Sequence, residues 1–226
     1  METLVVLSEK NWHEDLFINL KRLHPEYNWI QIKERKEFNL SYLRSFCPVK
    51  IFIPHWSYVI PEEIFSEFEC IVFHMTDLPY GRGGSPLQNL IIRGFTETKI
   101  SALKVEKGID SGPIYLKSPL SLHGTANEIF LNASHVIEQM IGRIIKEKPA
   151  PILQEGEPTI FQRRKPKDSN ISDLRNLEQV YDYIRMLDAE GYPNAYVEFG
   201  GFRLEFSRVK KESNKSLLAD VRIIKK

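Results

Sequence analysis

The sequence predicts an α/β protein, with a Rossmann-like domain built on a mainly parallel sheet and a small C-terminal α+β appendage of the truncated-barrel kind. Apolar runs of strand length alternate with helical stretches over the first part of the chain, a pattern that predicts a parallel sheet covered on both faces. A Pro-rich, acidic stretch then leads to one amphipathic helix and a strand–turn–strand pattern. We therefore expect a catalytic domain at residues 1–158 and an appendage at 159–226.

Each element follows from a local pattern. Apolar or β-branched runs predict strands at residues 4–7, 28–32, 49–53, 70–73 and 98–106. Apolar residues at helical spacing, aided by Pro61 at one start and Gly94 at one end, predict helices at residues 11–23, 61–69, 86–94 and 126–146. Beyond the boundary, residues 173–191 form an amphipathic helix pattern, and 195–209 read as two strands joined by a turn at Gly200 and Gly201.

Composition restricts the class of protein. The 226 residues are 42% hydrophobic and 27% charged, which is enough apolar material for a core. Lys and Arg number 31 against 30 Asp and Glu, a net charge of +1, so the chain lacks the overall positive field that attracts proteins to nucleic acid or anionic membranes. We expect neither a nucleic-acid partner nor a membrane.

Location and metal content follow from what the sequence lacks. The first residues have no basic leader or cleavage signal, and no apolar run approaches the roughly 18 to 20 residues of a membrane-spanning helix. Cys47 and Cys70 are too few and too far apart for a zinc cluster or a redox pair, so we interpret them as structural thiols. We expect a cytoplasmic protein without a metal.

Chemistry-bearing residues gather around one predicted edge of the sheet. His74 closes a predicted strand and leads into the glycine-rich loop 81–86, and Asp110 follows the next predicted strand. Ligands bind beyond the carboxyl ends of strands in open parallel sheets. If both residues lie at that end of neighbouring strands, the carboxylate can orient the imidazole, as a general base requires. Taken alone, each residue is more commonly structural than catalytic.

These residues resemble a family, the formyltransferases that use N10-formyltetrahydrofolate. The family carries a strand that ends in Asn-x-His, a Ser/Thr-x-Leu-Pro and Arg-Gly-x-x-Pro stretch, and a later Asp-x-Gly. The matching positions are His74, Thr76 to Pro79, Arg82 to Pro86 and Asp110 to Gly112. The resemblance extends to the closing strands and includes the segment IRMLDAEGYPNAY.

One position departs from the family pattern. The residue two places before His74 is Val72, where the family has an Asn that helps to stabilise the oxyanion. A valine side chain has no hydrogen-bond donor. We expect Thr76, Gln88 or backbone N–H groups to supply a substitute, and a catalytically silent folate-binding homologue stays open as the alternative.

The resemblance implies the reaction and its sites. An amine attacks the formyl carbon, His74 accepts or shuttles the amine proton, and Asp110 orients His74. N10-formyltetrahydrofolate is the implied cofactor, and its pterin would lie on two loops, at residues Ser57, Tyr58, Val59, Glu106, Lys107 and Ile109.

The identity of the amine is the next question. Within the family the sequence looks most like the branch that formylates amino sugars linked to nucleotides, as PseJ-type enzymes of the pseudaminic acid pathway do. We expect the 4-amino group of a UDP-linked 4-amino-4,6-dideoxy sugar, such as UDP-2-acetamido-4-amino-2,4,6-trideoxy-L-altrose, in surface polysaccharide biosynthesis. The candidate substrate-binding residues are Arg82, Gly83, Arg163, Arg164, Arg185, Tyr192 and Asn194.

Other acceptors stay open. They are an amino acid or peptide, glycinamide ribonucleotide and initiator Met-tRNA. We place Met-tRNA lower because the chain is short and nearly neutral, and phosphate contacts dominate RNA affinity. A homodimer is the default expectation for a soluble enzyme.

Overall fold

The computed structural model describes all 226 residues. The strands are β1 (Thr3–Ser8), β2 (Asn28–Ile32), β3 (Lys50–His55), β4 (Cys70–His74), β5 (Arg82–Gly83), β6 (Glu97–Lys104), β7 (Ile114–Ser121), β8 (Ile160–Phe161), β9 (Ala195–Phe199), β10 (Phe202–Ser213) and β11 (Ser216–Lys225). The α-helices are α1 (Glu14–Leu23), α2 (Leu40–Arg44), α3 (Glu62–Phe65), α4 (Pro86–Ile92), α5 (Ala126–Glu147) and α6 (Leu177–Arg185), with 3-10 turns η1 (Asn11–His13) and η2 (Pro166–Ser169).

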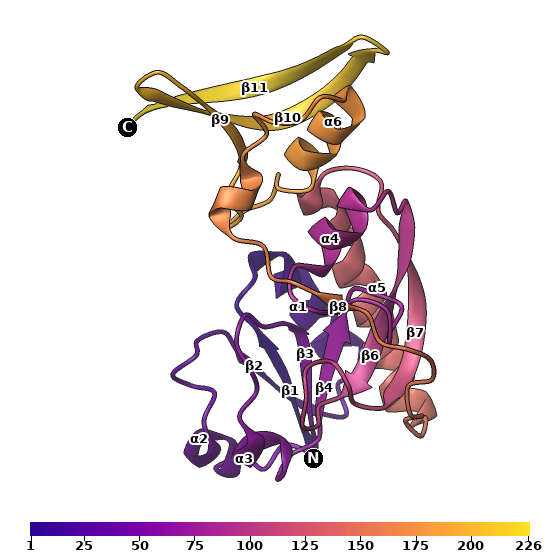
Figure 1. Ribbon diagram of the computed structural model, residues 1–226. Coiled ribbons are helices and arrows are strands. Elements are labelled where there is room, and N and C mark those ends of the chain that lie inside the picture. Colours follow the sequence, from indigo (N-terminus) through magenta and orange to yellow (C-terminus); the bar gives the residue numbers. More distant parts are fainter. The chain divides into compact units, whose positions relative to one another are not determined.

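A six-stranded sheet in the order β2-β1-β3-β4-β6-β7 forms the centre of the fold (Figure 1). The pairs β1–β2, β1–β3 and β3–β4 are parallel, whereas β6 runs antiparallel to β4. The sheet is therefore mainly parallel, and the predicted Rossmann-like fold class with a C-terminal β appendage is confirmed.

Helices cover both faces of this sheet. On one face α1 and α5 lie side by side, and Asn19 Nδ2 donates to Glu138 Oε2 over 3.0 Å. On the other face a buried hydrophobic cluster joins the strands to α2 through Leu43 and to α3 through Ile64, both fully buried. Cys70 belongs to this cluster, so alternation along β4 places Val72 and His74 on the same face.

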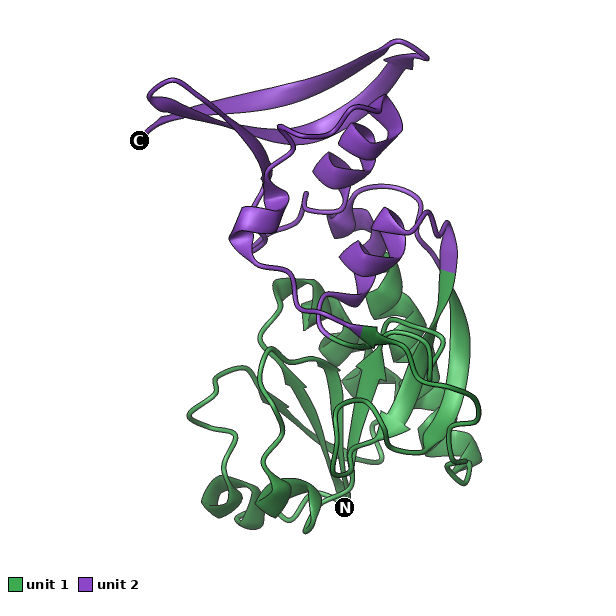
Figure 2. Ribbon diagram, viewed as in Figure 1, with its two compact units in different colours: residues 1–83, 98–120, 131–160 green, residues 84–97, 121–130, 161–226 purple.

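The chain divides into two compact units, each made of segments that are distant in sequence (Figure 2). Unit 1 contains residues 1–83, 98–120 and 131–160. Unit 2 contains residues 84–97, 121–130 and 161–226. The division at residue 158 stays a prediction. None of the helices is both long enough and apolar enough to cross a lipid bilayer.

The C-terminal part of unit 2 is a three-stranded sheet, β11-β10-β9, with α6 against β10. Its helix is shorter than the predicted 173–191, because Asn176 caps the helix by accepting a hydrogen bond from the Glu178 N–H over 2.7 Å. Strand β11 was not predicted. Its sequence SLLADVRIIK lacks a regular apolar–polar alternation, and half of its side chains or more are exposed.

His13 is a buried polar residue at the carboxyl end of β1. It is 2% exposed, and its Nδ1 lies 2.6 Å from the Ser8 hydroxyl. Burial, followed by the charges of His55 and Lys10, lowers the pKa of His13 from 6.5 to about 3. His13 is therefore neutral in the folded protein near neutral pH.

We predict that His13 destabilises the protein in mild acid. Because its pKa is lowered on folding, the unfolded chain binds the proton first; the stabilisation is complete above pH 6.5 and is lost as pH falls toward 3. Between pH 7 and 5 the free energy of unfolding should fall by about 2 kcal/mol more in the wild type than in His13→Asn. Urea unfolding at both pH values measures this. The exposed His135→Asn should behave as wild type, and equal pH dependence in His13→Asn would refute the prediction.

Candidate active site

His74 stands at the carboxyl end of β4 and is 7% exposed. Its ring lies between two acceptors in unit 1. Nε2 is 2.7 Å from the Gly81 carbonyl oxygen, and Nδ1 is 3.5 Å from Asp110 Oδ2. The first distance is a short hydrogen bond, and the second is an ion-pair distance. The structure thus brings together the two residues that the sequence singled out for catalysis.

Asp110 reaches His74 by a different route from the predicted one. We expected both residues at the same end of parallel neighbouring strands, and this is wrong because β6 is antiparallel to β4. The loop after β6 leaves at the opposite end and must fold back. Gly108, with φ of +105°, and Asp110, with φ of +50°, both take left-handed conformations in this return. Gly112 follows, where an added Cβ would lie 1.8 Å from the Lys104 carbonyl oxygen.

The Asp110 carboxylate is held by backbone. The Gly83 N–H donates to Asp110 Oδ2 over 2.8 Å, and the same oxygen faces His74. A carbonyl oxygen can only accept, so Nε2 of His74 carries its hydrogen toward Gly81. On the opposite side of the ring, Nδ1 faces the Asp110 carboxylate.

A buried serine, Ser101, fixes the loop between His74 and Gly81. Ser101 Oγ donates to the Thr76 carbonyl oxygen over 2.7 Å and accepts from the Leu78 N–H over 3.3 Å. Ser101 and Thr76 are both fully buried. This pins the chain that carries the Gly81 carbonyl.

Val72, which replaces the family's Asn, is part of the packing. It is half-buried against the hydrophobic cluster, as are Trp56 and Val105 from the two neighbouring loops. The two predicted substitute donors are already used. Thr76 Oγ1 donates to the Gly81 carbonyl oxygen over 3.4 Å, and Gln88, which belongs to unit 2, donates to the Met186 carbonyl oxygen over 3.1 Å. Among the predicted substitutes, backbone N–H groups remain.

The two loops predicted to hold the pterin carry exposed apolar side chains. Val59 is 83% exposed and Ile109 is 68% exposed, whereas Tyr58 is covered by the Arg35 guanidinium at 4.4 Å. Ser57 donates a hydrogen bond to the Glu9 carboxylate. Solvent-exposed aliphatic groups beside backbone amides suit the flat, partly apolar face of a pterin, so these loops fit the predicted cofactor.

Glu106 and Lys107 are exposed in the second of these loops. Glu106 lies 4.0 Å from Lys104, and the Lys107 carbonyl oxygen accepts from Ser111 over 3.2 Å. Lys107 therefore shapes the loop through its backbone. The cofactor-binding roles of all six residues stay predictions.

Sequence reasoning missed Gln154, in the segment we interpreted as a linker. Its Oε1 accepts from Arg82 Nε and Nη2, over 3.1 and 2.8 Å, and its Nε2 donates to the carbonyl oxygens of Asp110 and Gly112, each over 2.8 Å. Arg82, a predicted substrate ligand, is thus directed toward Gln154. No sequence motif marks this residue.

The remaining predicted substrate residues lie in unit 2. Arg163 is exposed beside Gly84, and Arg164 is half-buried with its guanidinium over Tyr183 at 5.2 Å. Arg185 is buried, and its Nη1 donates to two carbonyl oxygens, those of Leu122 and Gly124, over 2.6 and 2.9 Å. Arg185 is therefore built into the packing of its unit.

Tyr192 and Asn194, the other two predicted sugar contacts, are half-buried. Tyr192 stacks on Phe130 with ring centroids 5.3 Å apart.

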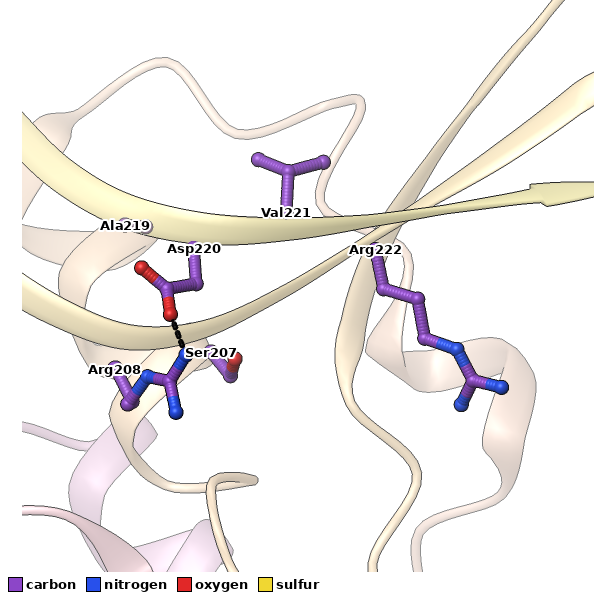
Figure 3. A pocket seen from close by; sticks show the side chains of 6 residues that line it. All are labelled: Ser207, Arg208, Ala219, Asp220, Val221 and Arg222. Carbon is purple, nitrogen blue, oxygen red and sulfur yellow. Dashed lines mark hydrogen bonds and ion pairs between the residues drawn. The ribbon is translucent and has the colours of Figure 1, made fainter.

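A separate hollow of about 600 Å³ lies at the irregular stretch of the β10–β11 pair. Figure 3 shows Asp220 directed toward Arg208, with which it forms an ion pair, and Val221 on the opposite side of the strand. Arg222 also lines the hollow. None of the predicted catalytic residues lies there, and we assign it no chemistry. No cluster of three metal-ligating side chains occurs in the structure.

Comparison with known proteins identifies the family. A solved structure described as methionyl-tRNA formyltransferase from Clostridium thermocellum is 49% identical and superposes with a TM-score of 0.97, covering 100% of both chains. The chain belongs to the formyltransferase family. A family model for the C-terminal domain of methionyl-tRNA formyltransferase matches residues 166–224. The methionyl-tRNA formyltransferase of Sorangium cellulosum is 30% identical over 64% of this chain and 48% of its own length.

N10-formyltetrahydrofolate is the formyl donor of this family, so the predicted cofactor is confirmed. HypX from Aquifex aeolicus, whose structure was solved with tetrahydrofolic acid, shares the fold at 14% identity and a TM-score of 0.75, over 92% of this chain and 38% of its own. The chain spans about half the length of the curated relatives that it matches.

The predicted substrate is wrong. Expectations of a nucleotide-linked amino sugar, of surface polysaccharide biosynthesis and of no nucleic-acid partner are overturned by relatives that are described as methionyl-tRNA formyltransferases. The acceptor is therefore no longer expected to be a sugar, and substrate-binding roles for Arg185, Tyr192 and Asn194 stay predictions. The net charge of +1 led us to expect no nucleic-acid partner, but the net charge of a whole chain does not show where its charges cluster.

Proposed function

We propose that this protein formylates the α-amino group of methionine carried on tRNA, with N10-formyltetrahydrofolate as donor. The observation that carries the proposal is the match over the full chain, at 49% identity, to a structure described as methionyl-tRNA formyltransferase. The His74–Asp110 pair beside two loops with exposed apolar side chains supports an acyl-transfer site.

His74 is the proton carrier in this proposal. When bound, N10-formyltetrahydrofolate supplies the electrophilic formyl carbon. In this proposal the acting ring carries one proton, on Nδ1 facing Asp110. Nε2, turned away from the Gly81 carbonyl oxygen, can then take the proton that the attacking amine loses and pass it to the folate nitrogen that leaves. Asp110 holds the ring by Nδ1 and stabilises its charged form, while the Gly83 N–H fixes the carboxylate.

Local charge supports an RNA partner. Residues 161–226 contain 14 Lys and Arg against 10 Asp and Glu, and four of the five residues from 163 to 167 are basic. Arg163, Lys165 and Lys167 are exposed. A basic segment of this kind can neutralise backbone phosphates even in a nearly neutral chain.

We predict formyl transfer to charged tRNA that depends on His74. With N10-formyltetrahydrofolate and Met-tRNA, mass spectrometry of the released amino acid should show formylmethionine. His74→Ala should lower kcat by roughly 10²–10⁴-fold, because general acid–base catalysis is lost, while the exposed His135→Ala should not. No formylation by the wild type would refute the function, leaving a non-catalytic folate-binding homologue. Full turnover by His74→Ala would refute the role of the residue.

We predict a measurable phosphate contribution from the basic segment. Lys165→Ala/Lys167→Ala should weaken Met-tRNA binding and make the slope of log Kd against log salt shallower by about 1–2. The control Lys21→Ala/Lys146→Ala removes two exposed lysines from α1 and α5. Fluorescence anisotropy across a salt series measures both. Equal slopes in the wild type and the first variant would exclude this segment as an RNA contact.

We predict that an amide at position 72 accelerates the reaction. Val72→Asn would place a donor on the face of β4 that carries His74, and one oxyanion donor contributes up to about 10²–10³ in kcat. The melting temperature should fall, because the amide enters an apolar cluster. Val72→Leu, which adds no donor, is the control. If Val72→Asn is no faster than Val72→Leu, other groups already stabilise the oxyanion.

A further inference from the structure

The segment between α5 and β8 is attached to unit 1 on both sides of Gln154. Before it, Ile152 exchanges two backbone hydrogen bonds with Ile114, over 2.7 and 2.9 Å. After it, the Thr159 carbonyl oxygen accepts from the Arg82 N–H over 2.9 Å. The segment that looks like a linker in the sequence is thus a fixed strap across the site loops. Gln154 is half-buried in the middle of it.

The Gln154 side chain uses both ends of its amide. The NH₂ group donates to the carbonyl oxygens of Asp110 and Gly112, each over 2.8 Å, and the oxygen accepts twice from the Arg82 guanidinium. An amide is the only side-chain group that offers two donors and two acceptor lone pairs at this reach. A carboxylate would place an oxygen against two carbonyl oxygens.

These contacts close a ring that passes through Asp110. Gln154 binds Arg82, the next residue Gly83 donates its N–H to the Asp110 carboxylate, and Asp110 returns to Gln154 through its carbonyl oxygen. Asp110 has a left-handed φ of +50°, a conformation that persists in non-glycine residues when the surroundings determine it. The hydrogen bond from Gln154 to the Asp110 carbonyl oxygen holds this conformation from outside the loop.

We propose that Gln154 is a positioning residue, which sets the Asp110 carboxylate against His74 by clamping the Arg82–Gly83 segment to the loop that carries Asp110. The role rests on the proposed catalytic function of His74 and Asp110. The carboxylate oxygen shared by the Gly83 N–H and His74 is the atom whose position depends on the clamp. Gln154 acts through Asp110 and does not itself take part in the chemistry.

The test replaces the amide by its acid. Gln154→Glu keeps the acceptor for Arg82 and removes both donors, and it should lower kcat by about 10–100-fold, as the loss of a supporting contact does. The KM for the folate should change little. The matched control Gln139→Glu adds the same charge at an exposed site on α5 and should behave as wild type. Melting curves of Gln154→Glu and Gln154→Ala establish that both variants fold.

A double-mutant cycle distinguishes positioning from general stability. If Gln154 acts through Asp110, Gln154→Ala should have little further effect on kcat in an Asp110→Ala background, whereas independent effects would multiply. Independent effects, or an unchanged kcat in both single variants of Gln154, would overturn the proposal.

A second readout needs no acceptor substrate. The ¹⁵N chemical shifts of the His74 ring should change with pH differently in Gln154→Glu and in wild type, because the carboxylate facing Nδ1 is displaced. Unchanged shifts would overturn the clamp even if the protein formylates Met-tRNA. Altered shifts without any formylation would leave the clamp standing and refute the proposed function.

Discussion

The antiparallel course of β6 beside β4 is the constraint on which the site depends. Pairing of Ile71 with Lys104 and of His74 with Ser101 fixes where β6 ends, at the edge away from His74. The loop must therefore return along the sheet to place a carboxylate at the imidazole. Its left-handed residues and the glycine with no space for a Cβ are the means of that return.

This geometry places an acceptor oxygen at each of the two ring nitrogens of His74. Gly81 and Asp110 face opposite ring nitrogens, so the contacts on both sides fix the orientation of the ring. In the proposed reaction, one of these two contacts must open before the ring can carry a proton. The carbonyl of Gly81 is the contact that can be exchanged, since Asp110 is itself tied to the Gly83 N–H. A general acid–base group needs one ring nitrogen held in place, here by Asp110, and the other able to exchange its partner, here the Gly81 carbonyl oxygen.

The sequence could predict the parallel core and the closeness of His74 to Asp110, but only part of how the two are brought together. Apolar runs mark β1, β3 and β4 because strands buried on both faces carry little else. The sequence of β6 does not indicate the direction of the strand, because apolar–polar alternation looks the same in parallel and antiparallel strands. Gln154 was missed because a single glutamine in a Pro-rich stretch has the composition of an exposed linker, and only the backbone bonds on either side of it show otherwise.

Val72 lies where the hydrophobic core meets the proposed active site, two residues before His74. The hydrophobic cluster that packs α2 and α3 on the sheet extends along β4 to Val72, and Trp56 and Val105 pack against the same cluster. Such packing favours an aliphatic group and penalises an amide that lacks partners. At this position the chain thus has apolar packing in place of a hydrogen-bond donor, and in the proposed reaction stabilisation of the oxyanion would fall to backbone N–H groups.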